Sequence, residues 1–573
     1  MKRLVLVCAS YILLSAIIFF PLLREFNGVV AAGGDSYFLI WNMWWVHEGQ
    51  HKPGQSLLWT DYQFHPTGTS LLLQPFDMAQ IAWVWPIYSL WGPIVANSVV
   101  VFISFFLTGF CTFLLARMLG LTDGAAFVSG LVFMMSSFHF HHIQGGHTSL
   151  ASLYWLPLFC VALIFWWRKP SARFQVWLGV AFWALFYTNW YLTACGLLFA
   201  ICWLGVSLWE RPALTGEKPR WLGLVGALAL GFAGVAPILV PAVLHAREFV
   251  MPFGHVPFSA DVLSFFVPGQ FSAWGDLTSV WQGFTGNGSE NGNYLGFVAL
   301  ILAAVGIRFC RESRVWMVVI VLAVLLSLGP YLHVNGRWEF ATESLGPLRA
   351  PAEWVSGTAR RLNPSWCVAP GHVAVPLPYL GLKEIPFFST ARAPARFMAL
   401  TFLALAVSAG FGTNWLLGRF EGRRRVVVLS TLVLLMVVEH YPRLSFVRPE
   451  ADPFFGQLAA TPGDFAILDC SEPWLRLYNQ TIHGKRMVGG YVGREQIKAQ
   501  QVLGEAGVEA WMNGHSIERD LRQVKDWLIA NQVRFVVVPG SFEEVRAQLQ
   551  QADFQCVYRS DRIVVYACTV PQT

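Results

Sequence analysis

The stretch GGDSYFLIWNMWW, residues 33–45, sets one carboxylate, Asp35, between a glycine pair and an apolar, aromatic segment. A carboxylate beside apolar surface should have a raised pKa unless it is paired, and such a group suits a general base or a metal ligand. Alternatively, Asp35 or Ser36 caps a helix over residues 37–47 and satisfies its free amides. The residues alone leave both interpretations open.

Histidines form a second group in FHFHHIQGGHTSL, which holds His139, His141, His142 and His147 around another glycine pair. Imidazole is a common metal ligand, so this density suggests a metal site. However, no HxxxH pair sits clearly on one helix face, and no acidic residue is close in sequence. The rings could instead bind phosphate oxygens or form a hydrated cluster without a ligand.

Two further pairs carry weaker signals. Asp61 and His65 lie four residues apart in DYQFHPTGTSLL and could bind a metal or a phosphate, or only form a turn. Arg392 and Arg396 lie in ARAPARF, just before a hydrophobic run. Guanidinium groups pair with phosphate or carboxylate, and the alternative is anchoring at a membrane interface. If that end of the run faces outward, where arginine is the less favoured anchor, anion binding is the better interpretation.

The composition identifies the elements that must position these residues. The chain has 573 residues, 55% hydrophobic and 13% charged, with a net charge of +6. Globular domains carry about 25% charged residues, and runs of about 17–25 apolar residues recur here, as membrane-spanning helices require. The chain is therefore a multi-pass membrane protein. Its basic residues lie in short clusters between apolar runs, which is a topology signal and excludes a nucleic-acid partner.

We expect about eleven spans, the first of them an uncleaved N-terminal segment. The run 70–92 is broken by Pro75, Asp77 and Pro86, so we interpret it as a helix lying in the membrane interface. The basic clusters of the short loops then fall on the side of the N-terminus, which the positive-inside rule makes cytoplasmic. The expected spans are about 4–22, 96–116, 124–138, 149–167, 174–188, 191–209, 221–244, 295–308, 315–330, 397–418 and 425–440.

The long loops 23–95, 245–294 and 331–396 face outward in this topology, as does everything after about residue 441. Residues 441–573 predict a small α+β domain, and residues 1–440 form the membrane module. Strands are expected in DFAILDC and VRFVVVPG, helices in IERDLRQVKDWLIANQ and in the Ser-capped SFEEVRAQLQQ, and a hairpin in FQCVYRSDRIVVYAC. Cys556 and Cys568 flank that hairpin and would pair only in an oxidising compartment.

Taken together, these pieces resemble the GT-C superfamily of polytopic membrane glycosyltransferases, and more narrowly a set of its bacterial members. The resemblance covers nearly the whole chain and rests on the ensemble of pieces. They are GDSYFLIWNMWW, YQFHPTGTSLL, GGHTSLASLYWLPL, SADVLSFFVPG, ENGNYLGFVAL, ARAPARF and NQTIHGKRMVGGYVGR. The implied fold is mostly α: a polytopic helix bundle with a small C-terminal exoplasmic α+β domain.

The resemblance implies transfer of a sugar from a polyprenyl-phosphate donor to a cell-envelope glycan or lipid, on the outer face of the bacterial inner membrane. The family's first-loop aspartate, here Asp35, is the base that deprotonates the acceptor hydroxyl, and one in-line displacement inverts the anomeric carbon. The leaving lipid phosphate needs positive or hydrogen-bonding partners, for which Arg392, Arg396 and the histidines are candidates. Glu290, in SENGNYLG, would orient an acceptor hydroxyl or help to hold a divalent cation.

Two departures limit the resemblance. Asp35 is the single acidic residue between the glycine pair at 33–34 and Glu48, whereas some members carry paired acidic residues there, and the tail lacks the WWD tripeptide. The missing tripeptide argues against transfer of a whole glycan to asparagine. Two other classes of function stay open: a lipid carrier or transport protein, which would place charges in the bundle core, and a non-catalytic scaffold that acts through the tail.

Overall fold

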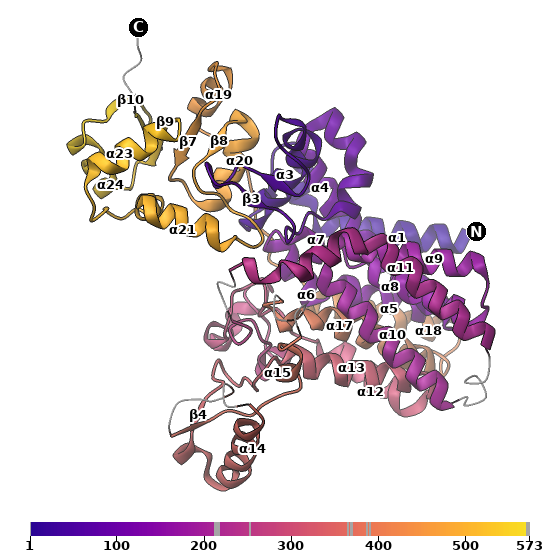
Figure 1. The fold of residues 1–573 in the computed structure, drawn as a ribbon. Coiled ribbons are helices and arrows are strands. Elements are labelled where there is room, and N and C mark those ends of the chain that lie inside the picture. Colours follow the sequence, from indigo (N-terminus) through magenta and orange to yellow (C-terminus); the bar gives the residue numbers. More distant parts are fainter. Residues whose placement is uncertain are drawn as a thin grey trace.

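The computed structural model describes residues 2–210, 218–250, 254–363, 366, 371–385, 388 and 391–568. Helices dominate, and Figure 1 shows a bundle of long helices that includes the N-terminus, with a sheet-containing C-terminal domain standing at one end of it. The predicted mostly α architecture with a small C-terminal α+β domain is therefore confirmed.

Each hydrophobic segment expected to span a membrane lies on a helix. These helices are α1 (Lys2–Ile18), α4 (Met78–Met118), α5 (Asp123–Met134), α8 (Trp155–Arg168), α9 (Ala172–Thr188), α10 (Trp190–Glu210), α11 (Lys218–Leu244), α12 (Phe297–Phe309), α13 (Arg314–Ser327), α17 (Met398–Leu417) and α18 (Gly422–Glu439). Within the described residues, four stretches are long and apolar enough to cross a membrane, namely α4, α10, Trp221–Leu244 and Pro394–Leu417. They mark a membrane protein, and the count of about eleven crossings stays a prediction.

The segment expected at 124–138 is interrupted. Helix α5 ends at Met134, and the Ser136 side chain accepts a hydrogen bond from the His139 amide to begin a new helix, α6 (Ser137–Gln144). A helix of 12 residues rises about 18 Å, less than the bilayer core of about 30 Å. Helix α5 is therefore too short to cross alone, and a polar serine starts the separate helix that carries the histidines.

Most of the segment 70–92 forms the first part of α4, and a break in the helix separates it from the remainder. Gly92 breaks the helix with φ 79° and ψ 179°, and Pro93 follows. Before the break, Leu90 and Trp91 are 69% and 63% exposed, as expected of a helix that turns an apolar face toward lipid. The structure thus separates this segment from the longer helix behind it, while its depth relative to a membrane stays a prediction.

Helix α17 is the most enclosed helix of the bundle and packs against α12, α5 and α13. Its sequence contains no Asp, Glu, Lys or Arg, so it is buried almost entirely without an unpaired charge. A short helical turn, η9 (Pro394–Phe397), leads directly into it. Arg396 is therefore held at the N-terminal end of a rigid, buried element.

The connecting segments gather at the end of the bundle that faces the C-terminal domain (Figure 1). They include α2 (Phe20–Arg24), α3 (Asp35–His47), α6, α7 (Thr148–Ala151), α14 (Arg349–Leu362) and α15 (Tyr379–Leu382). Short antiparallel pairs tie them together: β1 (Val30–Ala31) with β6 (Phe446–Val447), β2 (Trp59–Thr60) with β3 (Thr69–Ser70), and β4 (Phe340–Ala341) with β5 (His372–Val373). Part of the expected outer loop 331–396 lies outside the described residues.

The C-terminal domain is built on a five-stranded sheet with the order β10-β11-β9-β7-β8. Its strands are β7 (Ala466–Asp469), β8 (Arg486–Met487), β9 (Val533–Pro539), β10 (Gln555–Arg559) and β11 (Ile563–Ala567). The pairs of β7 with β8 and β9 are parallel, and those of β11 with β9 and β10 are antiparallel. The helices are α19 (Pro453–Ala460), α20 (Pro473–His483), α21 (Ile497–Ala506), α22 (Val508–Met512), α23 (Leu521–Ala530) and α24 (Glu543–Gln551).

The two strand segments, the two helices and the hairpin predicted in the tail are therefore confirmed, with one correction of detail. Helix α24 begins after Phe542 without a side-chain cap, so the predicted Ser cap is wrong. Cys556 and Cys568 are both free thiols. The hairpin register places Cys556 opposite Tyr566, so the two cysteines are not cross-strand neighbours.

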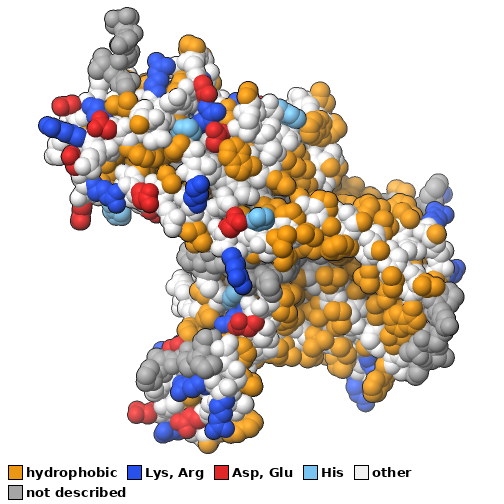
Figure 2. Space-filling model, in the orientation of Figure 1, with side chains coloured by type: hydrophobic (Ala, Val, Ile, Leu, Met, Phe, Trp, Pro, Cys, Tyr) orange, Lys and Arg blue, Asp and Glu red, His pale blue; other side chains and the backbone are white. Residues whose placement is uncertain are grey.

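The C-terminal domain and the first outer loop share one hydrophobic core. Trp41 and Trp45 of α3 are fully buried in the same cluster as Leu477 of α20 and the inner face of the sheet. The Trp41 indole nitrogen also donates to the Gln480 side chain at 2.7 Å. Figure 2 shows hydrophobic side chains gathered over the bundle, with charges of both signs over the sheet domain and around α14. The sheet domain is thus fastened to the loop that carries Asp35.

Candidate active site

Two glycine pairs bring Asp35 and His147 together. The amide of Gly33 donates to the Gln144 carbonyl at 3.0 Å, and a Cβ at Gly33 would lie 2.3 Å from the carbonyl carbon of Gly145. Gly146 has φ +80°, and a Cβ there would lie 2.1 Å from the Ser36 amide nitrogen. Only residues without side chains let these two turns pack backbone to backbone.

Asp35 does not cap α3. The helix begins at Asp35 itself, Gly34 is the N-cap residue, and no side chain forms a cap hydrogen bond. Instead, Asp35 Oδ2 contacts His147 Nε2 at 2.8 Å, and Oδ1 accepts from the Tyr491 hydroxyl at 3.2 Å. The capping interpretation is therefore wrong, and the carboxylate is held by side chains from two distant parts of the chain.

The charge state of Asp35 follows from these contacts. Burial raises the pKa of Asp35, whereas the hydrogen bond and charge of His147 lower it. The Tyr491 hydroxyl and the Arg396 charge lower it further, and the net pKa lies below the ordinary aspartate value. Because Asp35 is paired, its pKa is not raised in the way that the sequence predicted for an unpaired carboxylate. With 36% of its side chain exposed, Asp35 is an ionised and accessible base at neutral pH.

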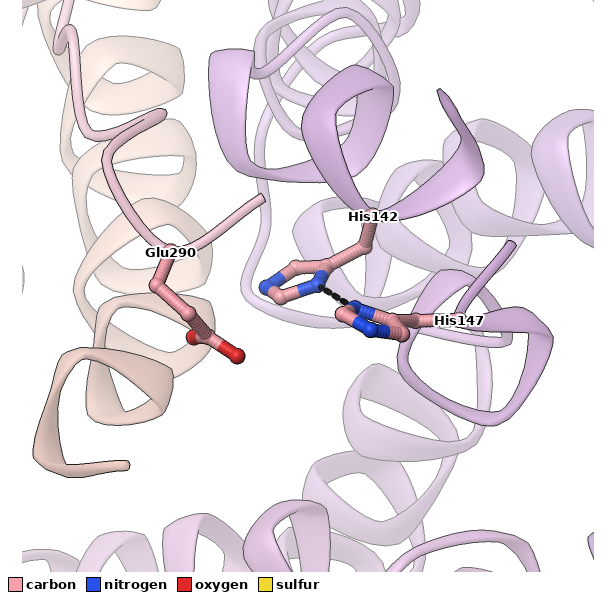
Figure 3. A group of neighbouring side chains, drawn as sticks. All are labelled: His142, His147 and Glu290. Carbon is pink, nitrogen blue, oxygen red and sulfur yellow. Dashed lines mark hydrogen bonds between the residues drawn. The ribbon is translucent and has the colours of Figure 1, made fainter. Parts of the chain in front are cut away.

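The hydrogen bonds continue from His147 to His142, whose Nδ1 atoms lie 2.8 Å apart. Figure 3 shows the two rings facing each other and the Glu290 carboxylate turned toward them. Burial lowers the pKa of His142 well below its usual value, which keeps the ring neutral. Among the described residues, His142 Nε2 and Glu290 Oε2 are buried without a hydrogen-bond partner.

One ligand atom from each of these three residues lies within 4.8 Å of the others. Two imidazoles and a carboxylate are a ligand set that suits a divalent cation such as Zn²⁺. The direct bond between the two Nδ1 atoms means that one ring must turn before both can bind the same ion. The residues therefore fit a cation, with the two buried unpartnered atoms as its first ligands.

Glu290 also forms an ion pair with Arg396. Glu290 Oε1 accepts from Arg396 Nε at 2.9 Å and from Nη2 at 2.6 Å, and both side chains are largely buried. The Arg396 guanidinium lies over the Tyr191 ring, 4.7 Å from its centre. The guanidinium is thus fixed on one edge by a carboxylate and on one face by an aromatic ring.

Three arginines are grouped near this point: Arg392, Arg396 and Arg494. Burial, together with the charges of Arg392 and Arg396, lowers the pKa of Arg494 to about 10. This repulsion disfavours the charged form of Arg494, and an anion bound beside it would relieve the repulsion. The group therefore has the electrostatic character of an anion site.

Two cavities meet here. One, of about 730 Å³, is lined by Asp35, His147, Glu290, all three arginines, Tyr491 and Trp474. The other, of about 280 Å³, is mainly apolar and is lined by side chains that include Leu57, Leu72, Trp190 and Ile238. They share Pro75, Asp77, Asn189, Arg396 and Arg494. Arg396 and Arg494 thus stand between an apolar chamber and a larger cavity of mixed lining that carries the charged residues.

A family model matches residues 63–369, more than half of the chain. The chain belongs to the family described as Domain of unknown function (DUF6311). A search of curated proteins finds no match to this DUF6311 member.

Solved structures show its fold. The cryo-EM structure of the arabinofuranosyltransferase AftD from Mycobacteria aligns with 100% of this chain at 12% identity and a TM-score of 0.57. The match covers 40% of AftD, so this chain spans less than half of that protein. ArnT from Cupriavidus metallidurans (12% identity, TM-score 0.47, 98% of both chains) and AglB from Archaeoglobus fulgidus (13%, 0.43, 93% of this chain and 69% of AglB) are more distant. The DUF6311 chain has the GT-C fold.

Three residues singled out in the sequence lie away from the cavities. Asp61 accepts from Gln55 at 2.7 Å and pairs with Arg486 of β8 at 3.0 Å. His65 Nε2 contacts the Asn531 carbonyl at 3.0 Å. These two residues fasten the first loop to the sheet domain, in a turn that Gly68 closes with φ +70°. Their contacts favour the turn interpretation.

His139 is also structural in character. Its Nδ1 and Nε2 atoms contact the backbone carbonyls of Met134 and Ala151 at 2.9 and 2.8 Å. The ring thereby joins the end of α5 to α7 and leaves no nitrogen for a ligand. Of the histidine cluster, only His142 and His147 face Glu290 and Asp35.

Sequence reasoning missed three residues of the site. Tyr491 and Arg494 come from the tail piece GGYVGR, which carries a third glycine pair like those beside Asp35 and His147. That repeated Gly-Gly signal could have pointed to them. Asp77, noted only as a helix breaker, lines both cavities with its side chain buried.

Proposed function

We propose that the chain is a glycosyltransferase that moves a sugar from a polyprenyl-phosphate donor to an acceptor of the cell envelope. The observation that carries the proposal is the junction of the two cavities. Arg396 and Arg494 line both the apolar chamber and the adjoining larger cavity, and the ionised Asp35 carboxylate lies in that larger cavity. A lipid-linked phosphate needs cationic groups beside an apolar chamber, and an attacking hydroxyl needs an ionised carboxylate that can take its proton.

Asp35 is the base in this proposal. As the acceptor oxygen forms its bond to the anomeric carbon, its proton passes to the Asp35 carboxylate. The bond from that carbon to the phosphate oxygen breaks at the same time, and the electron pair leaves with the lipid phosphate. Such positioned proton transfer is worth about 10²–10⁴-fold in rate. A single in-line displacement of this kind inverts the anomeric centre.

The arginines stabilise the leaving group. Negative charge grows on the phosphate oxygen as the bond breaks, and Arg396 and Arg494 line both cavities where that phosphate would sit. Guanidinium groups bind phosphate oxygens through paired hydrogen bonds. The Glu290 pair holds Arg396 in position without using all of its donors.

The apolar chamber suits the first isoprene units of the carrier. Its lining comes from the first loop and from α10 and α11, so a lipid diffusing in the bilayer could enter beside these helices. Asp61, His65 and His139 have no part in this arrangement, because none of them lines either cavity.

His142, His147 and Glu290 would hold the divalent cation, if one is used. A bound cation there would supply Lewis-acid stabilisation of negative charge near Asp35 and Arg396. Without it, His147 orients the Asp35 carboxylate and keeps it ionised.

The fold supports the same activity by analogy, because AftD is an arabinofuranosyltransferase and this chain aligns with part of it. The positive-inside pattern places the site on the outer face of the inner membrane, with the sheet domain in the periplasm. A transport protein is disfavoured because α17, the most enclosed helix, carries no charged residue. A non-catalytic scaffold would not need the Asp35 contacts.

The test is deletion of the gene, with envelope glycans and lipids compared by mass spectrometry and the strain complemented with wild type, Asp35→Asn or Asp61→Asn. Asp61 is the matched control, a carboxylate of the same loop that lies outside the cavity. We expect one sugar mass to disappear and to return with wild type and Asp61→Asn, but not with Asp35→Asn at equal membrane levels. Full restoration by Asp35→Asn, or no change on deletion, would overturn the proposal.

A further inference from the structure

Trp474 is an exposed indole in the cavity that holds Asp35. It lies in the first turn of α20, in the C-terminal domain, and lines the larger cavity. Its relative exposure is 40%, whereas Trp41 and Trp45 of the same region are fully buried. A large aromatic side chain left open inside a cavity contributes little to the core, which points to a ligand-binding role.

The backbone is shaped around this ring. A Cβ at Gly34 would lie 2.9 Å from Trp474 Cδ2, so the glycine lets the indole rest against the chain immediately before Asp35. Further along α20, Leu477 is buried in the core and the Gln480 side chain accepts a hydrogen bond from the Trp41 indole. The helix is therefore fixed, and the indole is held beside the base rather than free to fold away.

The surroundings of Trp474 differ from the apolar chamber. The larger cavity also carries amide side chains, Gln270, Asn287 and Gln500, and the Glu495 carboxylate, whereas Leu57, Leu72 and Ile238 occur only in the smaller one. An open aromatic face in a cavity that also carries amides and carboxylates suits a pyranose or furanose ring, which has an apolar C–H face and a rim of hydroxyls. It does not match an acyl chain.

We infer that the acceptor is a glycan, and that one of its sugar rings stacks on Trp474 so that a hydroxyl of that ring or its neighbour meets Asp35. The inference rests on the proposed function and narrows its acceptor from a glycan or lipid to a carbohydrate. Trp474 is a positioning residue: it fixes the acceptor and takes no part in the bond changes. The donor lipid lies on the opposite side of the arginines and does not contact it.

The test uses the deletion strain complemented with Trp474→Phe, Trp474→Leu and Trp474→Ala at equal membrane levels. Trp354→Ala is the control, because Trp354 is 72% exposed on α14 and lines neither cavity. We expect the sugar mass to return with Trp474→Phe and with the control, and to stay at least tenfold below wild type with Trp474→Leu and Trp474→Ala. Leucine keeps apolar bulk without a ring face, so it separates stacking from packing.

A second measurement uses the purified full chain in nanodiscs with undecaprenyl phosphate as the probe. Binding of this lipid should be unchanged in Trp474→Ala and lost in Arg396→Ala, which shows that the variant is folded and that only acceptor binding is affected. Restoration of the mass by Trp474→Leu, or a lost mass carried on a lipid without a glycan, would overturn the inference while the transferase proposal stands. Failure of wild type to restore any sugar mass would overturn both.

Discussion

The Tyr491 hydroxyl donates to the Asp35 carboxylate at 3.2 Å, although 456 residues separate the two in the chain. Asp35 begins the helix that follows the first hydrophobic segment, and Tyr491 belongs to a loop of the sheet domain. The C-terminal domain therefore contributes a hydrogen-bond donor to the surroundings of the candidate base. The Tyr491 hydroxyl also helps to keep Asp35 ionised.

Tyr491→Phe should lower transfer by about 10- to 100-fold, because a hydrogen bond to a charged group is worth about 1.5–3 kcal/mol. The pKa of Asp35 should rise when this bond is lost. Activity needs ionised Asp35 and is lost as the pH falls through its pKa, so the acid limb of the pH–rate profile should move to higher pH. Tyr558→Phe is the matched control. The Tyr558 hydroxyl also donates to a carboxylate, that of Asp452, with a donor–acceptor distance of 2.9 Å, and this pair lies outside the cavity. An unmoved acid limb in Tyr491→Phe would contradict the assignment of Asp35 as the base.

Gly146→Ala should abolish transfer or assembly of the site. A Cβ there would lie 2.1 Å from the Ser36 amide nitrogen, so the two turns must separate and Asp35 must move away from His147. Gly54→Ala is a close control, since Gly54 has a similar φ of +76° but nothing within 4 Å of its Cβ position. Both variants carry the strain of a positive φ, and only Gly146→Ala adds the clash. Equal activity of the two in a complementation assay would show that the contact between the turns is dispensable.

Much of the helical framework could be predicted from the sequence because hydrophobic runs are a local signal. The segments expected at 174–188 and 397–418 became α9 and α17 within a few residues. The segment expected at 124–138 was misjudged because Ser136, a polar residue within an apolar run, begins a new helix. The strands of the tail could also be predicted, since DFAILDC and VRFVVVPG each contain a short apolar run, FAIL and FVVV.

Only part of the candidate site could be predicted from the sequence. Their chemistry pointed to Asp35, His147, Glu290, Arg392 and Arg396, and the structure brings these five to one cavity, with His142 behind His147. Asp61 and His65 looked equally suitable, but they contact the sheet domain instead. Nothing local distinguishes the two cases, because the partners Tyr491, Arg494 and Arg486 lie hundreds of residues away. The roles of the gathered residues stay predictions until they are tested.

Asp77→Asn should stabilise the protein relative to wild type by an amount that grows as the pH rises, and the gain should be larger at pH 8 than at pH 5. Both Asp77 carboxyl oxygens are buried without a hydrogen-bond partner among the described residues. Burial raises the pKa of Asp77 well above its usual value, so the folded state keeps a proton that the unfolded chain releases. Stability from this group is present below the unfolded pKa of about 3.9 and is lost as the pH rises. Melting temperatures of the purified chain in nanodiscs, recorded between pH 5 and 8, test this; parallel curves for the two proteins would show that Asp77 does not stay protonated in the fold.

Glu290→Gln should destabilise the protein by about 3–5 kcal/mol, because removing one partner of a buried pair leaves the other charge uncompensated. Glu290 and Arg396 retain only 2% and 15% of their side-chain exposure. The control is Glu353→Gln, which breaks the Arg349–Glu353 pair on α14, where both side chains are about half exposed. An exposed pair of that kind contributes about 0–1 kcal/mol. Thermal unfolding in nanodiscs should therefore show a large drop in melting temperature for Glu290→Gln and almost none for Glu353→Gln.

Addition of undecaprenyl phosphate should recover part of the stability lost in Glu290→Gln, because its phosphate supplies the negative charge that Arg396 then lacks. A Glu290→Gln variant as stable as wild type would show that solvent or another group already balances Arg396, and Arg396 would no longer be a suitable site for the leaving phosphate.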